Sequence, residues 1–188
     1  MSLLVAGLVL FLGIHLLPTV PAWRDALHAR LGDKPYRGVF SLVSLAGLVL
    51  IVIGYMRADP TVRMFDPVPA ARAIAPEAVT LALILFAASH MRAHLRKWVQ
   101  HPMVVGVILW SAVHLLANGE LRATVLFGSF LAWAIVDYVS ALARGATKPF
   151  VPVVRQDVMA IVGGTAVALV LMAVHRPLFG VPVVGFGL

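Results

Sequence analysis

Hydrophobic residues fill this 188-residue chain in long runs, and most of the polar positions fall between the runs. Each run is close to the roughly 20 residues that an α-helix needs to cross the hydrocarbon core of a bilayer. Nine of the 12 prolines lie at or near the ends of the runs, where a helix tolerates proline. We therefore predict an all-α integral membrane bundle of about six transmembrane helices, forming a single domain over residues 1–188. The predicted spans are Ser2–Val20, Tyr36–Arg57, Pro76–Lys97, Pro102–Asn118, Leu121–Ala143 and Gln156–His175.

Composition supports a membrane protein and limits the chemistry. Hydrophobic residues make up 61% of the chain and charged residues only 12%, against about a quarter in a soluble domain. The sequence has no cysteine, which excludes disulfides, iron–sulfur clusters and thiolate ligands. Histidine, present seven times, is then the strongest metal ligand available.

The net charge of +7 comes from Lys and Arg residues scattered through short loops between the apolar runs. This distribution indicates how the protein is oriented in the membrane and does not indicate a nucleic-acid partner. Ten of the 15 Lys and Arg residues lie in the loops after the first, third and fifth predicted spans. Since cytoplasmic loops carry the excess of Lys and Arg, both termini are expected on the outer, periplasmic side. The loop "PAWRDALHARLGDKPYRG" has Trp23, Ala26, Leu27 and Leu31 at helical spacing, which predicts a short amphipathic helix on the membrane surface.

Ionisable residues deep in a membrane span are rare and indicate function, and those of interest here are His15, His90, His94, His114 and Asp137. His90 and His94 are four residues apart, so they share one face of the third predicted span. They are expected to line a wet vestibule, or to bind a metal if other spans complete the site. Asp137 is expected to pair with a nearby cation.

The stretch "HPMVVGVILWSAVHLLANG" contains His101 at its start and His114 deep inside the span. Thirteen residues separate them, which leaves their side chains roughly 140° apart around a helix. His101 is expected to be an interfacial residue that contacts water. Trp110 and Ser111 share the face of His114 one turn earlier, so we expect them to line the same site.

His15 is the natural partner for His114, because the first span runs inward and the fourth runs outward. Their Cα atoms differ in depth by roughly 13 Å, and both side chains tilt toward the membrane centre. This arrangement predicts one imidazole on each axial face of a metal held between two helices, as in haem. The alternative is that each imidazole is bonded to a neighbouring carbonyl or serine.

Three stretches resemble the NnrU family of bacterial membrane proteins. They are "GIHLL" followed by "LGDKPYRGVFSLVSLAGLVL", then "HPMVVGVILWSAVHLLANG", then "AWAIVDYVSALAR". The resemblance implies a multi-pass protein of the bacterial inner membrane, linked to denitrification and nitric-oxide metabolism, with respiratory membrane proteins as partners.

The family's plant relative, 15-cis-zeta-carotene isomerase, extends what the resemblance implies. It suggests haem b as cofactor, His15 and His114 as iron ligands, and cis–trans isomerisation of a lipophilic polyene. Two positions depart from the family pattern. Gln100 stands where the family has arginine, and Ser111 stands where the plant enzyme has cysteine. A ligand switch that uses a thiolate therefore cannot operate unchanged in this chain.

Two other functions remain open. A haem-free scaffold for the assembly of respiratory complexes needs none of the buried histidines as ligands. A membrane methyltransferase that uses S-adenosylmethionine is suggested by the His101–Pro102 pair, but the acidic pair expected after a later helix is missing from "ALARGATKPFVPVVRQD".

Overall fold

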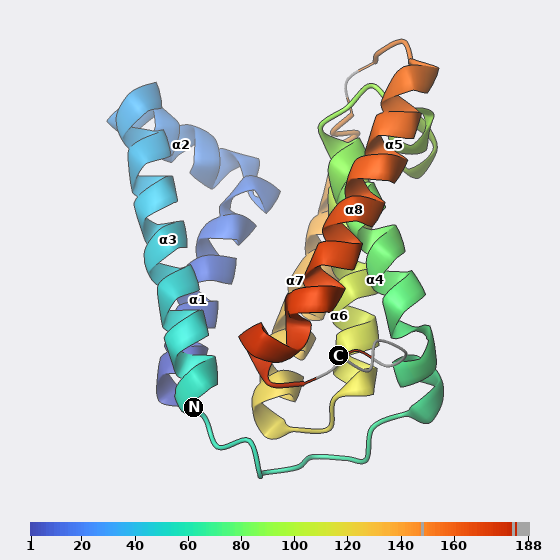
Figure 1. The fold of residues 1–188 in the computed structure, drawn as a ribbon. Helices are drawn as coiled ribbons and strands as arrows, with labels where there is room; N and C mark the ends of the chain where they lie inside the picture. Colours follow the sequence, from blue (N-terminus) through green and yellow to red (C-terminus); the bar gives the residue numbers. More distant parts are fainter. Residues whose placement is uncertain (148, 182, 184–188) are drawn as a thin grey trace. The chain divides into compact units, whose positions relative to one another are not determined.

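The computed structural model describes residues 1–147, 149–181 and 183, and the regular structure in these residues is helical (Figure 1). In chain order, the helices are α1 (Ser2–Leu16), the 3-10 turn η1 (Leu17–Thr19), α2 (Pro21–Leu31), α3 (Asp33–Arg57), α4 (Pro69–Ser89), α5 (His94–Val99), α6 (Pro102–Ala117), α7 (Leu121–Ala143) and α8 (Val154–Phe179). Among the described residues, five helical segments are long and apolar enough to cross a membrane, namely α1 with η1, α3, α4, α7 and α8. The prediction of an all-α membrane protein is confirmed.

Helix α6 is apolar but short, with 16 residues. At 1.5 Å per residue it is about 24 Å long, less than the roughly 30 Å of a hydrocarbon core. Pro102 opens the helix at a position where its missing N–H costs nothing. Asn118 ends it, because its extended backbone leaves the helix while its backbone and side-chain N–H groups both donate to the His114 carbonyl, at 3.1 and 2.7 Å.

The chain divides into two compact units. Unit 1 consists of Met1–Phe65 and Gly119–Trp133, and unit 2 consists of Asp66–Asn118 and Ala134–Leu188. Helix α7 contributes its first half to unit 1 and its second half to unit 2.

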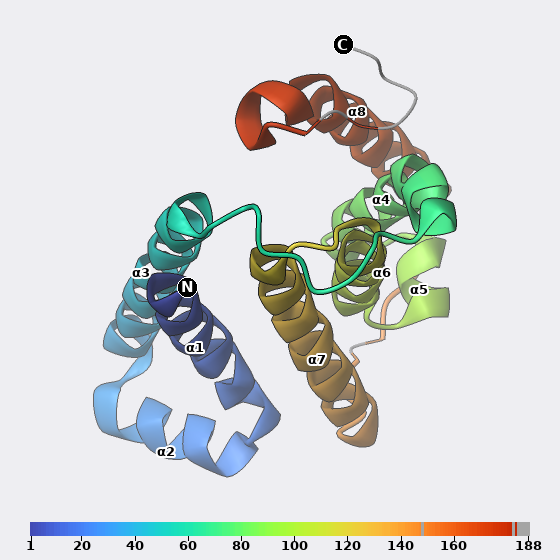
Figure 2. The same ribbon diagram turned by 90° about the horizontal axis from the view of Figure 1, so that it is seen from below.

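Unit 1 is built on the close packing of α1 against α3, which lie side by side in Figure 2. Leu4, Leu8, Leu12 and Ile51 form its buried cluster. Glycines on both helices allow the two backbones to approach. A Cβ at Gly7 would lie 2.5 Å from the Ile51 nitrogen, and one at Gly54 would overlap the Leu4 backbone. Small residues at such contacts are the usual means of helix association in membranes.

Unit 2 is centred on α4, which packs against both α6 and α8. A glycine mediates each contact. A Cβ at Gly106 of α6 would lie 2.6 Å from the Phe86 ring, and a Cβ at Gly164 of α8 would lie 2.5 Å from the Ile84 Cα atom.

The third predicted span, Pro76–Lys97, is wrong at both ends. Helix α4 begins at Pro69 and contains Pro76 in its interior. It stops at Ser89, after which the chain turns and a separate short helix, α5, follows. The reason for the break is tertiary: Ala93 is fully buried and forms a cluster with Ala88 and with Ala160 of α8.

Two other predictions have a clear outcome. The helix expected after the first span is confirmed as α2, in which Trp23 is 70% exposed, and its position on the membrane surface stays a prediction. The sixth predicted span, Gln156–His175, is extended at both ends in α8, which runs from Val154 to Phe179 and includes Pro177 in its last turn.

Candidate functional site

His114 lies in the last turn of α6 and is oriented by its own helix. Its Nδ1–H donates to the Trp110 carbonyl at 2.8 Å, and the imidazole and indole ring centroids are 5.4 Å apart. Because a carbonyl oxygen only accepts hydrogen bonds, the Nδ1 atom carries the proton and the lone pair resides on Nε2. Trp110 therefore lies beside His114 and fixes the imidazole tautomer through its carbonyl, while the expectation that it lines a cofactor site stays a prediction.

Ser111 is fully buried beside this position. Its hydroxyl donates to the Val107 carbonyl at 2.6 Å and lies 3.2 Å from the Ile108 carbonyl. These bonds to its own helix are the usual way in which serine is accommodated in an apolar helix. The prediction that Ser111 lines a cofactor stays a prediction.

A cavity of about 400 Å³ in unit 2 opens beside His114. Its polar lining comes from His114, His175, Arg72 and Asn118, and the remaining lining residues are apolar. Arg72 is held at the rim by a hydrogen bond from Nε to the Ala117 carbonyl at 3.0 Å. A mostly apolar cavity of this size with a few polar groups is typical of a small-molecule site.

His175 is a lining residue that the sequence analysis did not single out. Its Nδ1–H donates to the Val181 carbonyl at 2.7 Å, so its lone pair also resides on Nε2. A signal for it existed, because His175 and His114 both lie late in apolar segments that run in the same direction.

His15 lies in the last turn of α1, in unit 1. Its Nδ1–H donates to the Phe11 carbonyl at 2.6 Å, which again leaves the lone pair on Nε2. Aromatic rings surround the imidazole: Phe11 stacks on it at 4.3 Å, and Phe40 and Trp133 contact it edge-on, at 5.1 and 6.1 Å between centroids. His15 is therefore fixed in orientation within an apolar aromatic setting.

His15 and His114 thus share one local arrangement, although they belong to different units. Each donates from Nδ1 to the carbonyl four residues earlier and carries its lone pair on Nε2. A hydrogen bond from the second ring nitrogen to a carbonyl is the usual support of a histidine that ligates a metal. The sequence analysis offered a neighbouring carbonyl as an alternative to a metal, and the two are compatible because they use different nitrogens. Among the described residues, no group of three or more His, Asp or Glu side chains is arranged to hold a metal ion.

The predicted His90–His94 face does not exist. His90 caps the end of α4, whereas His94 starts α5 after the chain has turned. His94 instead pairs with Asp157 in the first turn of α8, with 2.6 Å between Nδ1 and Oδ2. Asp157 also accepts a hydrogen bond from the Leu95 amide at 3.3 Å. The sequence analysis missed Asp157, and the pairing of Asp137 with a cation stays a prediction.

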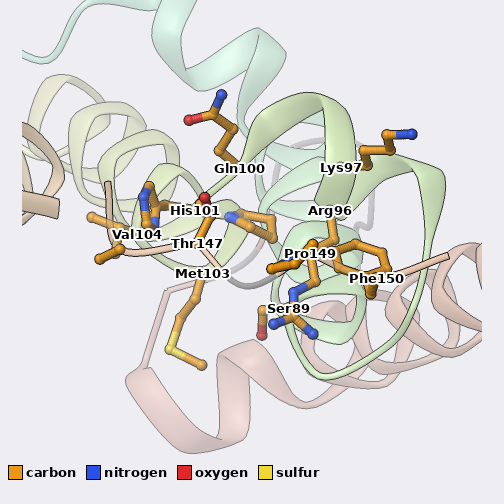
Figure 3. A pocket seen from close by; sticks show the side chains of 12 residues that line it. Ser89, Arg96, Lys97, Gln100, His101, Met103, Val104, Thr147, Pro149 and Phe150 are labelled. Carbon is orange, nitrogen blue, oxygen red and sulfur yellow. The ribbon is translucent and has the colours of Figure 1, made fainter. Parts of the chain in front are cut away.

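His101 is half-buried and directly precedes α6, and its Nε2 atom is buried without a hydrogen-bond partner among the described residues. The expectation that it contacts water at the interface stays a prediction. His101 lines a second and larger cavity of unit 2, with Arg96 and Phe150 among the other lining residues (Figure 3).

Apolar helices of spanning length, with histidines fixed among them, define a multi-pass α-helical membrane protein. The model of the NnrU protein family matches residues 3–183, nearly the whole chain, and the protein therefore belongs to this family. The resemblance found in the sequence is confirmed. Neither a curated protein nor a solved structure matches the chain.

Proposed function

We propose that this NnrU family protein binds haem b within the membrane, with His15 and His114 as the two axial ligands. The observation that carries the proposal is their shared geometry. In each residue a backbone carbonyl accepts a hydrogen bond from Nδ1–H, so that Nε2 carries the lone pair with which an imidazole binds a metal. When bound, haem b supplies an iron centre for one-electron chemistry, whose potential depends on the axial ligands.

The residues around each imidazole have defined tasks. The Phe11 and Trp110 carbonyls fix the ring orientations and make Nε2 a better electron donor. Phe11, Phe40 and Trp133 keep water away from His15 and limit its rotation. A ligand held in a single orientation loses little conformational entropy when it binds.

The cavity beside His114 supports a lipophilic small molecule as the substrate. Its walls are mostly apolar, and its volume of about 400 Å³ suits part of an extended molecule. This observation favours chemistry on a lipophilic polyene over a reaction confined to a diatomic gas. Arg72 and Asn118 would orient a polar end of such a molecule at the rim.

A bacterial inner membrane with both termini outside is the location that fits this function. Respiratory membrane proteins are the partners expected if the haem exchanges electrons. A haem-free scaffold for respiratory complexes and a membrane methyltransferase remain as alternatives that the spectroscopic experiment separates from haem binding.

The test is the visible and electron paramagnetic resonance spectrum of full-length protein, purified in detergent from haem-supplemented cells. The wild type is expected to show low-spin haem b. His15→Ala and His114→Ala are each expected to give high-spin or lost haem, because either change removes a ligand. The loss is expected to exceed the roughly 10–100-fold decrease in metal affinity that is usual when a residue hydrogen-bonded to a ligand, rather than the ligand itself, is replaced. His28→Ala is the matched control, since His28 is exposed and pairs with Asp33.

A rescue experiment separates loss of a ligand from loss of the fold. His114→Gly leaves room beside the cavity, so added imidazole should restore the low-spin spectrum. A colourless wild-type protein, or a wild-type spectrum that His114→Ala leaves unchanged, would disprove axial ligation by this pair. A colourless protein would favour the scaffold.

The cavity is tested separately by Ala75→Phe, which places a ring in the lining without altering either histidine. Retention of β-carotene during purification is the measurement, and the expected result is reduced carotenoid with an unchanged haem spectrum. Equal carotenoid in both proteins would reject the lipophilic site and leave haem binding intact.

A further inference from the structure

The second cavity of unit 2 has a volume of about 810 Å³ and lies at the junction of α5, the start of α6 and the segment that precedes α8. We propose that this cavity binds a phosphate group, carried either by a membrane phospholipid or by a small phosphorylated solute. The inference is independent of haem and uses none of the proposed iron ligands.

The charge of the lining favours an anion. Arg96 and Lys97 are its charged members among the described residues, and no Asp or Glu belongs to the lining described. Arg96 is held in place, because its guanidinium lies 5.0 Å from the centre of the Phe150 ring and Nη1 approaches the Met91 carbonyl at 3.5 Å. A guanidinium fixed in this way can form the paired hydrogen bonds that phosphate oxygens accept.

Figure 3 shows how the two cations differ. The Arg96 side chain lies beside Phe150 and Ser89, whereas the Lys97 side chain extends away from the other labelled residues. Arg96 is half-buried and Lys97 is exposed. Arg96 would therefore contact the phosphate directly, and Lys97 would add attraction at longer range.

His101 forms part of the cavity wall beside the start of α6. Its Nε2 atom is buried and has no hydrogen-bond partner among the described residues, which is costly for a polar atom and adds to the strain of the turn before α6. The N-terminus of α6 adds to the attraction, because Met103 and Val104 in its first turn also line the cavity.

Gln100 joins these groups through an unusual backbone conformation, with φ 61° and ψ −62°. The amide of His101 donates to the Val99 carbonyl at 2.8 Å, which makes this the rare and strained form of the three-residue turn. Strain of this kind is concentrated at ligand sites. Here the turn places Arg96 of α5 and the first turn of α6 on one cavity.

The experiment is isothermal calorimetry on full-length protein that has been stripped of lipid in an uncharged detergent. Three probes are used: dioctanoyl phosphatidylglycerol, glycerol 3-phosphate and dioctanoylglycerol. The first two contain phosphate, and the third has the acyl chains alone. We expect the phosphate probes to bind. Tighter binding of phosphatidylglycerol would identify a lipid head group, and equal binding of glycerol 3-phosphate would identify a phosphorylated solute.

Arg96→Gln is expected to weaken phosphate binding by about 10–100-fold, the effect of losing a charge-assisted hydrogen bond. Arg92→Gln is the matched control, since it removes the same charge close by in the sequence from a residue outside the lining. Thermal unfolding of each variant verifies that it is folded.

Three results would overturn the proposal. Binding of dioctanoylglycerol as tight as that of phosphatidylglycerol would show that the chains, not phosphate, are recognised. An equal loss in Arg92→Gln and Arg96→Gln would show non-specific attraction to a basic surface. Absence of binding by both phosphate probes would leave the cavity without this function.

Discussion

At the scale of single residues, the same local geometry at His15 and His114 is the main finding. Both follow the pattern in which an imidazole near a helix end donates to the carbonyl four residues earlier. The sequence placed these residues inside apolar segments. It did not decide which ring nitrogen would be tied to the backbone, because that depends on the side-chain rotamers in the folded helix.

Ser111 provides the first prediction at this scale. Ser111→Ala should leave the haem spectrum unchanged and alter the free energy of unfolding by less than about 1 kcal/mol. The reason is that, within the part of the chain that the structure describes, the hydroxyl bonds to carbonyls of its own helix, which the backbone already satisfies. The measurements are the visible spectrum and thermal unfolding in detergent. A shifted Soret band would show that Ser111 contacts the cofactor, as expected from the sequence.

The pair formed by His94 and Asp157 provides a second prediction for single residues. Asp157→Asn should loosen α5, because Asp157 accepts from both the His94 ring and the Leu95 amide. Hydrogen exchange followed by mass spectrometry should show faster exchange at the α5 amides and no change in α1. Asp25→Asn serves as control, since Asp25 is exposed and pairs with its sequence neighbour Arg24. Equal exchange in Asp157→Asn and wild type would contradict a role for this pair in holding α5.

At the scale of the elements, contacts through glycine decide how the helices pack. Gly54 of α3 meets the backbone of α1, and Gly164 of α8 meets Ile84 of α4. Neighbouring glycines behave differently: a Cβ at Gly13 or at Gly163 would meet nothing within 4 Å. Residue type alone therefore does not reveal which glycines are needed, because the answer depends on the facing helix.

Matched glycine variants test this packing. Gly54→Ala should lower the free energy of unfolding by about 1–3 kcal/mol, because the added methyl group overlaps backbone atoms that cannot rotate away. Gly13→Ala should leave the free energy of unfolding without a comparable loss, because a Cβ there meets nothing within 4 Å. Denaturation of the two purified variants in a detergent titration gives the comparison. Similar losses for both would show that glycine is needed for flexibility rather than for close packing.

At the scale of the whole molecule, the number of membrane crossings connects the fold to function. Five helical segments among the described residues have spanning length, and α6 is shorter. If α6 also crosses, the chain crosses six times and both termini are on one side. The distribution of Lys and Arg predicts that side to be the periplasm.

Reporter fusions test this topology. A reporter joined at Lys97 and one joined after Leu188 should report opposite sides, with Lys97 in the cytoplasm, because an odd number of crossings separates them. Alkaline phosphatase, active outside, and green fluorescent protein, fluorescent inside, give independent readings. A fusion at Arg63 is the control and should match the one after Leu188. The same side for Lys97 and Leu188 would show that one of the helices α6, α7 and α8 does not cross.

The sequence by itself determined the class of the protein, its family and most of its helices. Apolar runs must form helices in a bilayer, because every backbone polar group there has to be satisfied internally. The same reasoning located His15 and His114 and predicted α2. The tertiary structure decided where α4 stops, and the turn after it places Ala93 in a buried cluster with Ala88 and Ala160. It also decided that His94 meets Asp157, that His175 lines the cavity of His114, and that the Nε2 atom of His101 is buried. Such contacts join residues far apart in the chain, and no local pattern records them.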